Sequence, residues 1–242
     1  LRRRRRKDAV APAGGGEAVT GGRSSRKADL VEEEVVCDCD LILDTVVEID
    51  DLLTADECQR LIDAADARAA QVGWAEVKHG NYATEDVKII NLGSALARKI
   101  FEEKVATPLT AAIAKYFRLP KAGIKVDDGF VARYTMGRQT SLGFHRDGSI
   151  VSAILTLSAP DEYEGGGTLF RDGGLYRPGR GGGIVFGGQR QHSGEKITSG
   201  TRYICTIFFT CQQLSCRDEA VELDKQENGI WGGLAGLLGL NS

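Results

Sequence analysis

Between residues 129 and 210 the chain is a series of short apolar runs separated by glycine-rich turns. Five runs mix β-branched or aromatic residues with polar ones: FVARYT, SIVSAILTLS, GTLFRDG, GGGIVFGG and TRYICTIFFT. Several short strands with turn signals between them are typical of an antiparallel sandwich or barrel. This pattern constrains the fold more than any other feature, and it predicts a β core in the second half of the chain.

Helical patterns precede these strands. Thr54 and Glu57 fit a capping box at the start of a helix. Apolar residues follow at helical spacing, at Cys58, Leu61, Ile62 and Ala65. Helices first and strands after give an α+β fold class, in which the helices buttress the β core.

A second helix is predicted over 94–117, with Pro108 expected to kink or divide it. Its expected apolar face comprises Leu96, Ile100, Val105, Leu109 and Ile113. Ahead of both helices, the run LILDTVVEID at 41–50 is apolar and β-branched, which predicts a strand.

The chain of 242 residues is expected to form one domain with appendages. Residues 1–34 are rich in Arg, Gly, Ala and Ser and have few large apolar groups, so this basic tail is expected to be disordered. The folded domain is expected over 35–212, with helical support at 54–117 and the β core at 129–210. Residues 213–242 are interpreted as a C-terminal tail.

The two ends of the chain leave localisation open. The first residue is leucine, so we expect a processed or incomplete chain; the cationic run 2–7 then fits a solvated tail, a nuclear address or the flank of a lost anchor or signal. No stretch reaches the roughly 20 apolar residues that cross a bilayer, and 230–240 is interpreted as a packing or interfacial tail. Both the endoplasmic reticulum and the cytoplasm remain compatible with the sequence.

The net charge of −3 does not indicate attraction to nucleic acid or anionic membranes.

Six cysteines in a chain of this length do not make a disulfide scaffold. Cys205 lies in an apolar strand pattern and is expected in the core. Cys37 with Cys39, or Cys211 with Cys216, would suit a disulfide in an oxidising compartment, and the sequence leaves both pairings open.

The stretch GFHRDGS places His145 and Asp147 two positions apart. In an extended strand these side chains point the same way, and Arg146 points to the other side. An imidazole nitrogen and a carboxylate oxygen on one face make two adjacent ligands for a divalent metal. The alternative is a simple hydrogen bond between the two side chains near a turn.

A second histidine strengthens the metal hypothesis. His192 precedes a turn and a further alternating strand. Two histidines and one carboxylate form the facial triad of non-haem Fe(II) oxygenases. Ten residues past His192 comes Arg202, whose guanidinium fork suits a carboxylate. Lys196 competes for that role from the turn between them.

Taken together, His145-x-Asp147, His192 and Arg202, with YEGGGTLF at 163–170 and Tyr134-x-x-Gly137, resemble the 2-oxoglutarate/Fe(II) dioxygenase superfamily. The chain is most similar to its prolyl 4-hydroxylase and procollagen lysyl hydroxylase branch. The resemblance extends over 46–209 and is densest from 130.

The resemblance implies a double-stranded β-helix, or jelly roll, flanked by helices. It implies that His145, Asp147 and His192 bind Fe(II) and that Arg202 binds the far carboxylate of 2-oxoglutarate. Tyr134 and Thr168 match positions that hydrogen-bond this co-substrate. Prolyl 4-hydroxylases usually carry Lys where this chain has Arg202. The segments GTRYI and YEGGG are closer to the sequences of the lysyl hydroxylases.

The implied activity is hydroxylation of a peptidyl proline or lysine by O2, with 2-oxoglutarate converted to succinate and CO2 and L-ascorbate rescuing oxidised iron. The expected partner is therefore a protein or peptide substrate and not nucleic acid, and the oligomeric state is open. One alternative is an oxygenase of the same fold that acts on a small molecule or nucleic acid. Another is a non-enzymatic jelly-roll module that binds metal.

Four other features have simpler interpretations. His79 is expected in a surface loop, with a substrate contact as the alternative. The glycine runs 165–167 and 181–183 fit tight β turns better than phosphate-binding loops, because no Walker Lys-Ser/Thr follows them. Trp74 and Tyr82 are placed in a polar loop between the helices, where they either pack or cover the substrate.

Overall fold

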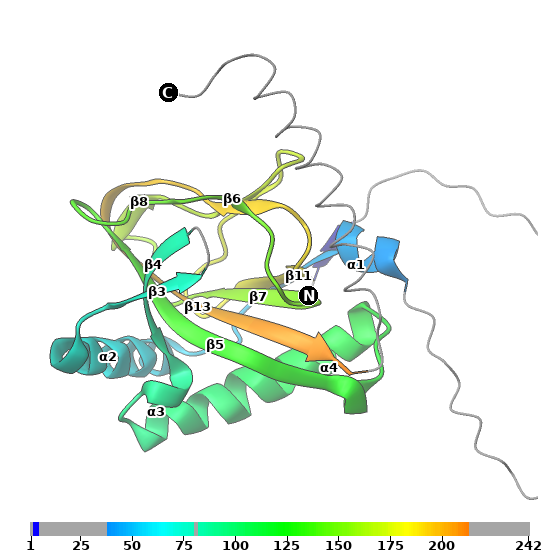
Figure 1. Ribbon diagram of the computed structural model, residues 1–242, viewed down its shortest axis with the longest axis horizontal. Coiled ribbons are helices and arrows are strands. Elements are labelled where there is room, and N and C mark those ends of the chain that lie inside the picture. The colour runs from blue at the N-terminus through cyan, green and yellow to red at the C-terminus, as the bar shows by residue number, and fades with distance from the viewer. Residues whose placement is uncertain (1, 5–37, 80–81, 213–242) are drawn as a thin grey trace, which may run out of the picture.

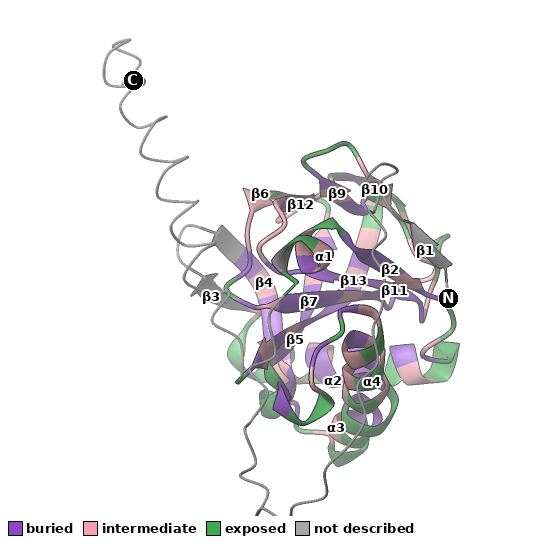
Figure 2. Ribbon diagram, turned by 90° about the vertical axis from the view of Figure 1, so that its right-hand side faces the viewer, coloured by how far each residue is buried: buried purple, intermediate pink, exposed green. Residues whose placement is uncertain are grey.

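A computed structural model describes residues 2–4, 38–79 and 82–212. Within these residues, two antiparallel sheets and a group of helices form three layers, with the larger sheet in the middle (Figures 1 and 2). This is the jelly-roll arrangement with supporting helices that the sequence predicts, so the expected α+β fold class is confirmed.

The larger sheet has the strand order β1-β2-β11-β7-β13-β5-β4-β3, and β8 pairs with β13 off this path. Its longest pairing joins β13 to β5, where Arg202 lies opposite Tyr134. The strands are β1 (Arg2–Arg4), β2 (Val46–Ile49), β3 (Ala75–His79), β4 (Tyr82–Lys88), β5 (Ile124–Thr135), β7 (Val151–Thr156), β8 (Tyr163–Gly165), β11 (Gly183–Gly187) and β13 (Ile197–Cys211). The five runs identified in the sequence each contribute a strand, as predicted.

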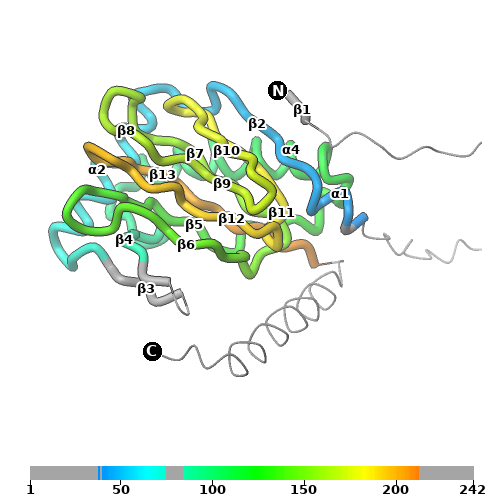
Figure 3. Tube along the Cα trace, turned by 90° about the horizontal axis from the view of Figure 1, so that it is seen from above, coloured from blue at the N-terminus to red at the C-terminus, as the bar shows by residue number. Residues whose placement is uncertain are grey.

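The smaller sheet lies over the larger one on the face opposite the helices (Figure 2). Its order is β10-β9-β12-β6. The strands are β6 (Leu142–His145), β9 (Thr168–Phe170), β10 (Leu175–Tyr176) and β12 (His192–Gly194). In the view from above, β12 and β6 run beside each other along the length of β13 (Figure 3).

Strand alternation separates the two faces of the larger sheet. Ala153, Leu155 and Cys205 are fully buried in the core that the helices share, which confirms the predicted core position of Cys205. Their neighbours Ile154 and Ile204 face the other way and line a cavity between the sheets. One face of the sheet therefore stabilises the fold, and the other carries the site.

Helix α2 (Ala55–Val72) begins as predicted. Thr54 N donates to Glu57 Oε2 at 2.8 Å, and Glu57 N donates to Thr54 Oγ1 at 3.2 Å, which completes the capping box. The predicted apolar face is buried, at Cys58, Leu61, Ile62 and Ala65.

The second predicted helix is divided into α3 (Ala95–Ile100), a π-helical segment (Phe101–Ala106) and α4 (Thr107–Tyr116). Pro108 lies in the first turn of α4, as expected of a residue that cannot donate a hydrogen bond to the preceding turn. Thr107 accordingly donates its N–H to Glu102 O, five residues back. The buried side of α3 is formed by Ala97 and Ile100, so Leu96 is 49% exposed where the sequence predicted burial.

The strand predicted over 41–50 is wrong in its first half. Residues Cys39–Asp44 form helix α1, and only β2 is extended. The side chain of Asp38 accepts a hydrogen bond from Leu41 N and caps this single turn. A helix turn started by such a cap outweighs the β propensity of a short apolar run.

The polar loop predicted around Trp74 is also wrong, because strands β3 and β4 form a hairpin there. Trp74 packs as an ordinary structural residue: the guanidinium of Arg133 lies 4.3 Å from its ring centroid, and the Tyr203 ring lies 6.1 Å away. The side chains of Tyr82 and His79 lie outside the described residues, as do residues 80–81.

Several predictions about the chain ends fall outside the described residues, among them the C-terminal tail and the cysteines at 37 and 216. Arg2–Arg4 lie within the segment expected to be disordered; they form β1 and pair with the edge strand β2, whose backbone groups are open to such pairing. Cys211 is a buried free thiol. None of the helices in the described ranges is long and apolar enough to span a membrane.

Candidate metal centre and adjoining cavity

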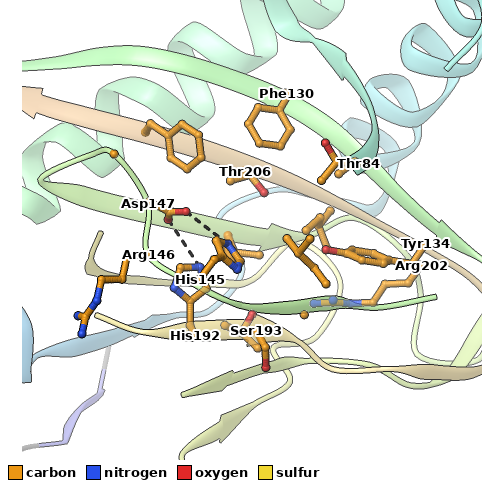
Figure 4. A pocket seen from close by; sticks show the side chains of 18 residues that line it. Thr84, Phe130, Tyr134, His145, Arg146, Asp147, His192, Ser193, Arg202 and Thr206 are labelled. Carbon is orange, nitrogen blue, oxygen red and sulfur yellow. Dashed lines mark ion pairs between the residues drawn. The ribbon is translucent and has the colours of Figure 1, made fainter. Parts of the chain in front are cut away.

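Two short strands bring the predicted histidines together. His145 is the last residue of β6, His192 is the first residue of β12, and the two residues are direct cross-strand partners. Their ring centroids are 4.3 Å apart. Asp147 lies just beyond the end of β6, and it still projects to the same side as His145 while Arg146 points away, as the spacing predicted (Figure 4). His192 begins the three-residue strand β12, and residues 195–196 then lead into the strand expected beyond it, β13.

The three side chains fit one divalent metal ion. His145 Nε2 lies 3.5 Å from Asp147 Oδ1, and His192 Nε2 lies 3.6 Å from Asp147 Oδ2. All three donor atoms lie within 4.8 Å of one another. Bonds of about 2.1 Å at right angles would place such donors about 3 Å apart, so a small contraction around an ion is sufficient.

Backbone carbonyl groups orient both imidazole rings. His145 Nδ1 lies 2.8 Å from Gly143 O, and His192 Nδ1 lies 2.9 Å from Arg190 O. A carbonyl oxygen only accepts hydrogen bonds, so each Nδ1 carries a proton, and Nε2 is the nitrogen of each ring that could bind a metal. This outer support fixes the tautomer that coordination needs.

Serine side chains support the carboxylate. Ser152 Oγ donates to Asp147 Oδ2, and Ser149 Oγ lies 2.8 Å from Ser152 Oγ. The Asp147 backbone is also held, because its N–H donates to Gly188 O at 2.8 Å. Sequence reasoning missed Ser152, although its place in the alternating run 149–158 puts it on the inner face of β7.

The triad has a distinct electrostatic character. Burial opposes ionisation of Asp147, but hydrogen bonding from His145 and the electrostatic effect of His192 outweigh it and hold the pKa of Asp147 below its usual value. Burial also opposes charging of His145, and the adjacent Asp147 more than offsets this and raises the pKa of His145. Burial lowers the pKa of His192. The site therefore holds a carboxylate and at least one neutral imidazole at neutral pH.

A cavity of about 410 Å³ extends from the triad between the two sheets. Figure 4 shows the triad toward one end of it and Arg202 with Tyr134 toward the other. Its lining comprises Thr84, Phe130, Ala132, Tyr134, Leu142, His145, Arg146, Asp147, Gly148, Ile154, Thr168, His192, Ser193, Gly194, Arg202, Ile204, Thr206 and Phe208. All six residues that the sequence singled out thus line one cavity.

Arg202 is a buried cation with few partners. It is 2% exposed, and its Nη1 makes only a long contact of 3.5 Å with Gly167 O. The rings of Tyr134 and Tyr163 lie about 6 Å from its guanidinium carbon, at 5.9 and 6.0 Å. Among the described residues no carboxylate pairs with Arg202, and its buried Nε has no hydrogen-bond acceptor. Lys196 is exposed outside the cavity, which favours Arg202 as the anchor for an anion.

The glycines at 165–167 lie close to the side chain of Arg202. All three have positive φ angles, of 76°, 66° and 114°, a conformation that glycine adopts readily, and they lie at the end of β8 and in the link to β9. A Cβ atom on Gly166 would lie only 3.0 Å from Arg202 Cδ. The second predicted turn is present, since Gly181 has a φ of 80° and packs against the backbone of Leu53.

Comparison with known proteins gives matches among solved structures alone. No protein-family model matches the chain, and no curated protein matches it. A Pseudomonas putida prolyl-4-hydroxylase superposes with a TM-score of 0.55 and 19% identity, over 69% of this chain and 92% of that one. A viral collagen prolyl hydroxylase from Paramecium bursaria Chlorella virus 1, solved with 2-oxoglutarate, gives 0.53 and 18%, over 69% and 95%. The non-haem α-ketoglutarate-dependent carbocyclase SnoK of nogalamycin biosynthesis gives 0.52 and 13%, over 68% and 78%.

At these identities the similarity establishes the fold, and the residues of this chain supply the rest. The neighbours share the double-stranded β-helix, and the HxD…H triad predicted from the sequence is assembled in one place. The chain therefore has the fold of the 2-oxoglutarate/Fe(II) oxygenases and carries their facial-triad pattern in His145, Asp147 and His192.

Proposed function

We propose that this protein is a 2-oxoglutarate- and Fe(II)-dependent dioxygenase that hydroxylates a peptidyl proline or lysine. One observation carries the proposal: a single cavity contains a metal-binding triad and, apart from it, a buried arginine without an acidic partner among the described residues. A metal ion would complete the triad, and a carboxylate would supply the missing acceptor for the arginine. A keto acid with a second carboxylate meets this requirement in one molecule.

Different residues of the cavity would bind the metal ion and the co-substrate. His145, Asp147 and His192 would hold Fe(II) on one face and leave the other positions of the ion open. Arg202 would bind the carboxylate of 2-oxoglutarate that lies far from the metal. Tyr134 and Thr168 would add hydrogen bonds to it. Burial raises the pKa of Tyr134, so its hydroxyl stays protonated and can donate.

When bound, Fe(II) supplies activation of O2, which is coupled to oxidative decarboxylation of 2-oxoglutarate: one oxygen atom enters succinate as CO2 leaves, and the other enters a C–H bond of the acceptor. The chain orients the reactants and keeps water away. Phe130, Ile204 and Phe208 give the cavity apolar walls, which limit access of water to the reacting groups. We expect L-ascorbate to sustain turnover by returning oxidised iron to Fe(II).

A peptide acceptor is supported by the resemblance to prolyl and lysyl hydroxylases and by the two prolyl hydroxylases among the structural neighbours. The presence of Arg202, where prolyl 4-hydroxylases usually carry lysine, favours testing lysine as well as proline. A small-molecule acceptor is the second candidate, because the carbocyclase SnoK shares the fold to a similar extent. The net charge of −3 does not favour nucleic acid.

The test is succinate formation across a panel of acceptors, with the modified residue located by mass spectrometry. Proline-rich and lysine-containing peptides form one arm, and small hydroxylatable compounds and alkylated nucleic acid form two others. We expect a peptide to raise succinate release above the uncoupled rate and to gain one oxygen atom. Stimulation by a small molecule or by nucleic acid alone would replace the peptide assignment. Iron binding without consumption of 2-oxoglutarate would indicate a non-enzymatic metal-binding module.

A further inference from the structure

A second hollow lies beside the metal site and is lined mainly by charged side chains. We call it the outer pocket; its volume is about 230 Å³. Its lining comprises Leu43, Asp44, Arg146, Arg171, Asp172, Arg190 and Gln191. The three arginines and two aspartates leave one net positive charge. Arg146 lines the main cavity as well, so the two hollows adjoin.

The chain itself ties the outer pocket to the metal ligands. Arg146 lies between His145 and Asp147, and its side chain points away from the triad (Figure 4). Its Nη1 donates to Gln189 O, which holds it in that direction. Arg190 precedes His192 by two residues, and its carbonyl oxygen orients the imidazole of His192. A group bound in the outer pocket would therefore lie next to the reacting centre and leave the metal accessible.

Arg190 has a donor that nothing in the described chain satisfies. Its Nη2 donates to Asp172 Oδ2 at 2.6 Å, and its guanidinium lies 4.5 Å from the centroid of the Phe170 ring. These two contacts fix its position. Its Nη1, however, is buried and has no acceptor among the described residues. A buried guanidinium N–H is costly in this state, and an anionic ligand would supply the acceptor.

Arg171 adds a second cation to the same wall. Its guanidinium lies 5.1 Å from the centroid of the Phe144 ring, which orients it without neutralising it. Within the described ranges no ion pair joins Arg171 to a carboxylate, in contrast to the pairing of Arg190 with Asp172. The pocket thus presents one partly neutralised arginine and one oriented, exposed arginine.

We infer that the outer pocket binds an aspartate or glutamate side chain of the acceptor peptide, close in sequence to the residue that is hydroxylated. This inference rests on the proposed function. Guanidinium groups bind a carboxylate through two parallel hydrogen bonds. The single net positive charge is neutralised by one carboxylate, whereas a dianionic phosphate would leave an excess negative charge beside Asp44 and Asp172.

The experiment uses paired peptides that differ at one flanking position. Each peptide has a central proline or lysine and carries glutamate at one flanking position; its twin carries glutamine there. Binding is measured by fluorescence anisotropy under anaerobic conditions with Fe(II) and 2-oxoglutarate, and succinate release is measured in air. At one or more positions, we expect the glutamate peptide to bind about tenfold more tightly than its twin.

Three variants assign this preference to the outer pocket. Arg171→Gln and Arg190→Gln should each remove most of the preference for glutamate, and Arg171→Gln should leave the KM for 2-oxoglutarate unchanged. Arg171→Glu should instead favour a twin that carries arginine at the same position. The matched control is Arg60→Gln, which removes another exposed arginine from an ion pair on α2 and should retain the preference.

Equal affinity for glutamate and glutamine peptides at every position would overturn the inference, as would a preference that persists in both glutamine variants. Displacement of the glutamate peptide by inorganic phosphate at lower concentrations than by acetate would overturn the carboxylate assignment. Binding and turnover separate the two proposals. Glutamate-dependent binding without hydroxylation would contradict the proposed peptide hydroxylase activity and support carboxylate binding in the outer pocket. Hydroxylation of peptides without a glutamate preference would support the proposed activity and contradict carboxylate binding in the outer pocket.

Discussion

The two ends of the main cavity satisfy their polar groups in opposite ways. At the metal end, each histidine Nδ1 has a carbonyl acceptor and Asp147 has Ser152 as a donor. At the other end, Arg202 is 2% exposed and has one long contact and an unpaired Nε among the described residues. The metal end is preorganised by the protein alone. The arginine end lacks such partners, which fits the proposal that 2-oxoglutarate binds there and leaves in each cycle.

The strands that carry the two ends of the cavity also differ. The proposed metal ligands come from the short strands β6 and β12 of the smaller sheet and from the loop after β6. Arg202 and Tyr134 face each other on β13 and β5, the longest pair in the larger sheet. Short strands can be held by a few backbone and side-chain hydrogen bonds, while the long pair gives Arg202 a rigid base. Substitutions at the two ends should therefore separate metal binding from co-substrate binding.

The largest effect is expected at the metal end. His145→Ala, Asp147→Ala and His192→Ala each remove a ligand, so Fe(II) affinity should fall by more than about a hundredfold, beyond the loss typical of an outer-shell partner. Succinate formation should fall with it. Anaerobic Fe(II) titration measures the first effect. His79→Ala is the control, because it removes the remaining histidine of the chain. Wild-type iron affinity in any of the three variants would remove that residue from the metal site.

The next effect is expected at the arginine end. Arg202→Met should raise the KM for 2-oxoglutarate about a hundredfold, since it removes one partner of a buried charge pair, and Fe(II) affinity should not change. Without 2-oxoglutarate the variant should be at least as stable to heat as the wild type, because a buried and unpaired charge is lost. Lys196→Met is the matched control. A larger change in KM for Lys196→Met than for Arg202→Met would transfer the role to the lysine.

A smaller effect should follow from the support of Asp147. Ser152→Ala removes a hydrogen-bond donor to the Asp147 carboxylate, so the dissociation constant for Fe(II) should rise. We expect a rise of about tenfold, the lower end of the losses typical when a residue that supports a metal ligand is removed. The KM for 2-oxoglutarate at saturating iron should stay constant. Ser158→Ala provides the comparison: this buried serine accepts a hydrogen bond from Tyr203 N at 2.8 Å and contacts no ligand. Identical iron affinity in the two variants would show that Ser152 does not position the carboxylate.

The smallest effect concerns the strand that carries Arg202. The adjacent Tyr203 donates from its hydroxyl to Asp66 Oδ1 of α2 at 3.1 Å, and burial together with this acid raises the pKa of Tyr203 to about 12. The unfolded chain loses the phenolic proton near pH 10. Stability from this group is therefore complete below pH 10 and is lost as the pH rises toward 12.

Urea unfolding of the wild type and of Tyr203→Phe should accordingly converge by about 1 kcal/mol over that range, a value reduced for solvent screening of a half-buried group. The difference between the two proteins isolates the tyrosine from lysines that titrate in the same range. Parallel stability curves would mean that the contact with Asp66 contributes nothing to anchoring the strand.

Much of the site could be predicted because its signals are local or belong to a motif set. The i, i+2 geometry of His145 and Asp147 follows from strand periodicity alone. The capping box of Thr54 and Glu57 is contained in four residues. The positions of His192 and Arg202 gained meaning through the resemblance, which joined them to the HxD pair.

The remainder depended on tertiary structure. The sequence does not state that β12 pairs with β6 and so sets His192 opposite His145. The exposure of Leu96 depends on how α3 packs in the folded chain, where Ala97 and Ile100 form its buried side. Similarly, the outer pocket depends on arginines at 146, 171 and 190, which are distant in sequence and gather only after folding.

The central claim is that one cavity binds Fe(II) and 2-oxoglutarate together, with the triad at one end and Arg202 at the other. Anaerobic addition of both to the purified protein tests it directly by visible absorption. We predict a metal-to-ligand charge-transfer band that requires both components, is absent in His145→Ala, and appears in Arg202→Met only at about a hundredfold higher 2-oxoglutarate. A protein that binds Fe(II) and develops no band at any concentration of the keto acid, or a band that persists in His145→Ala, would contradict the account.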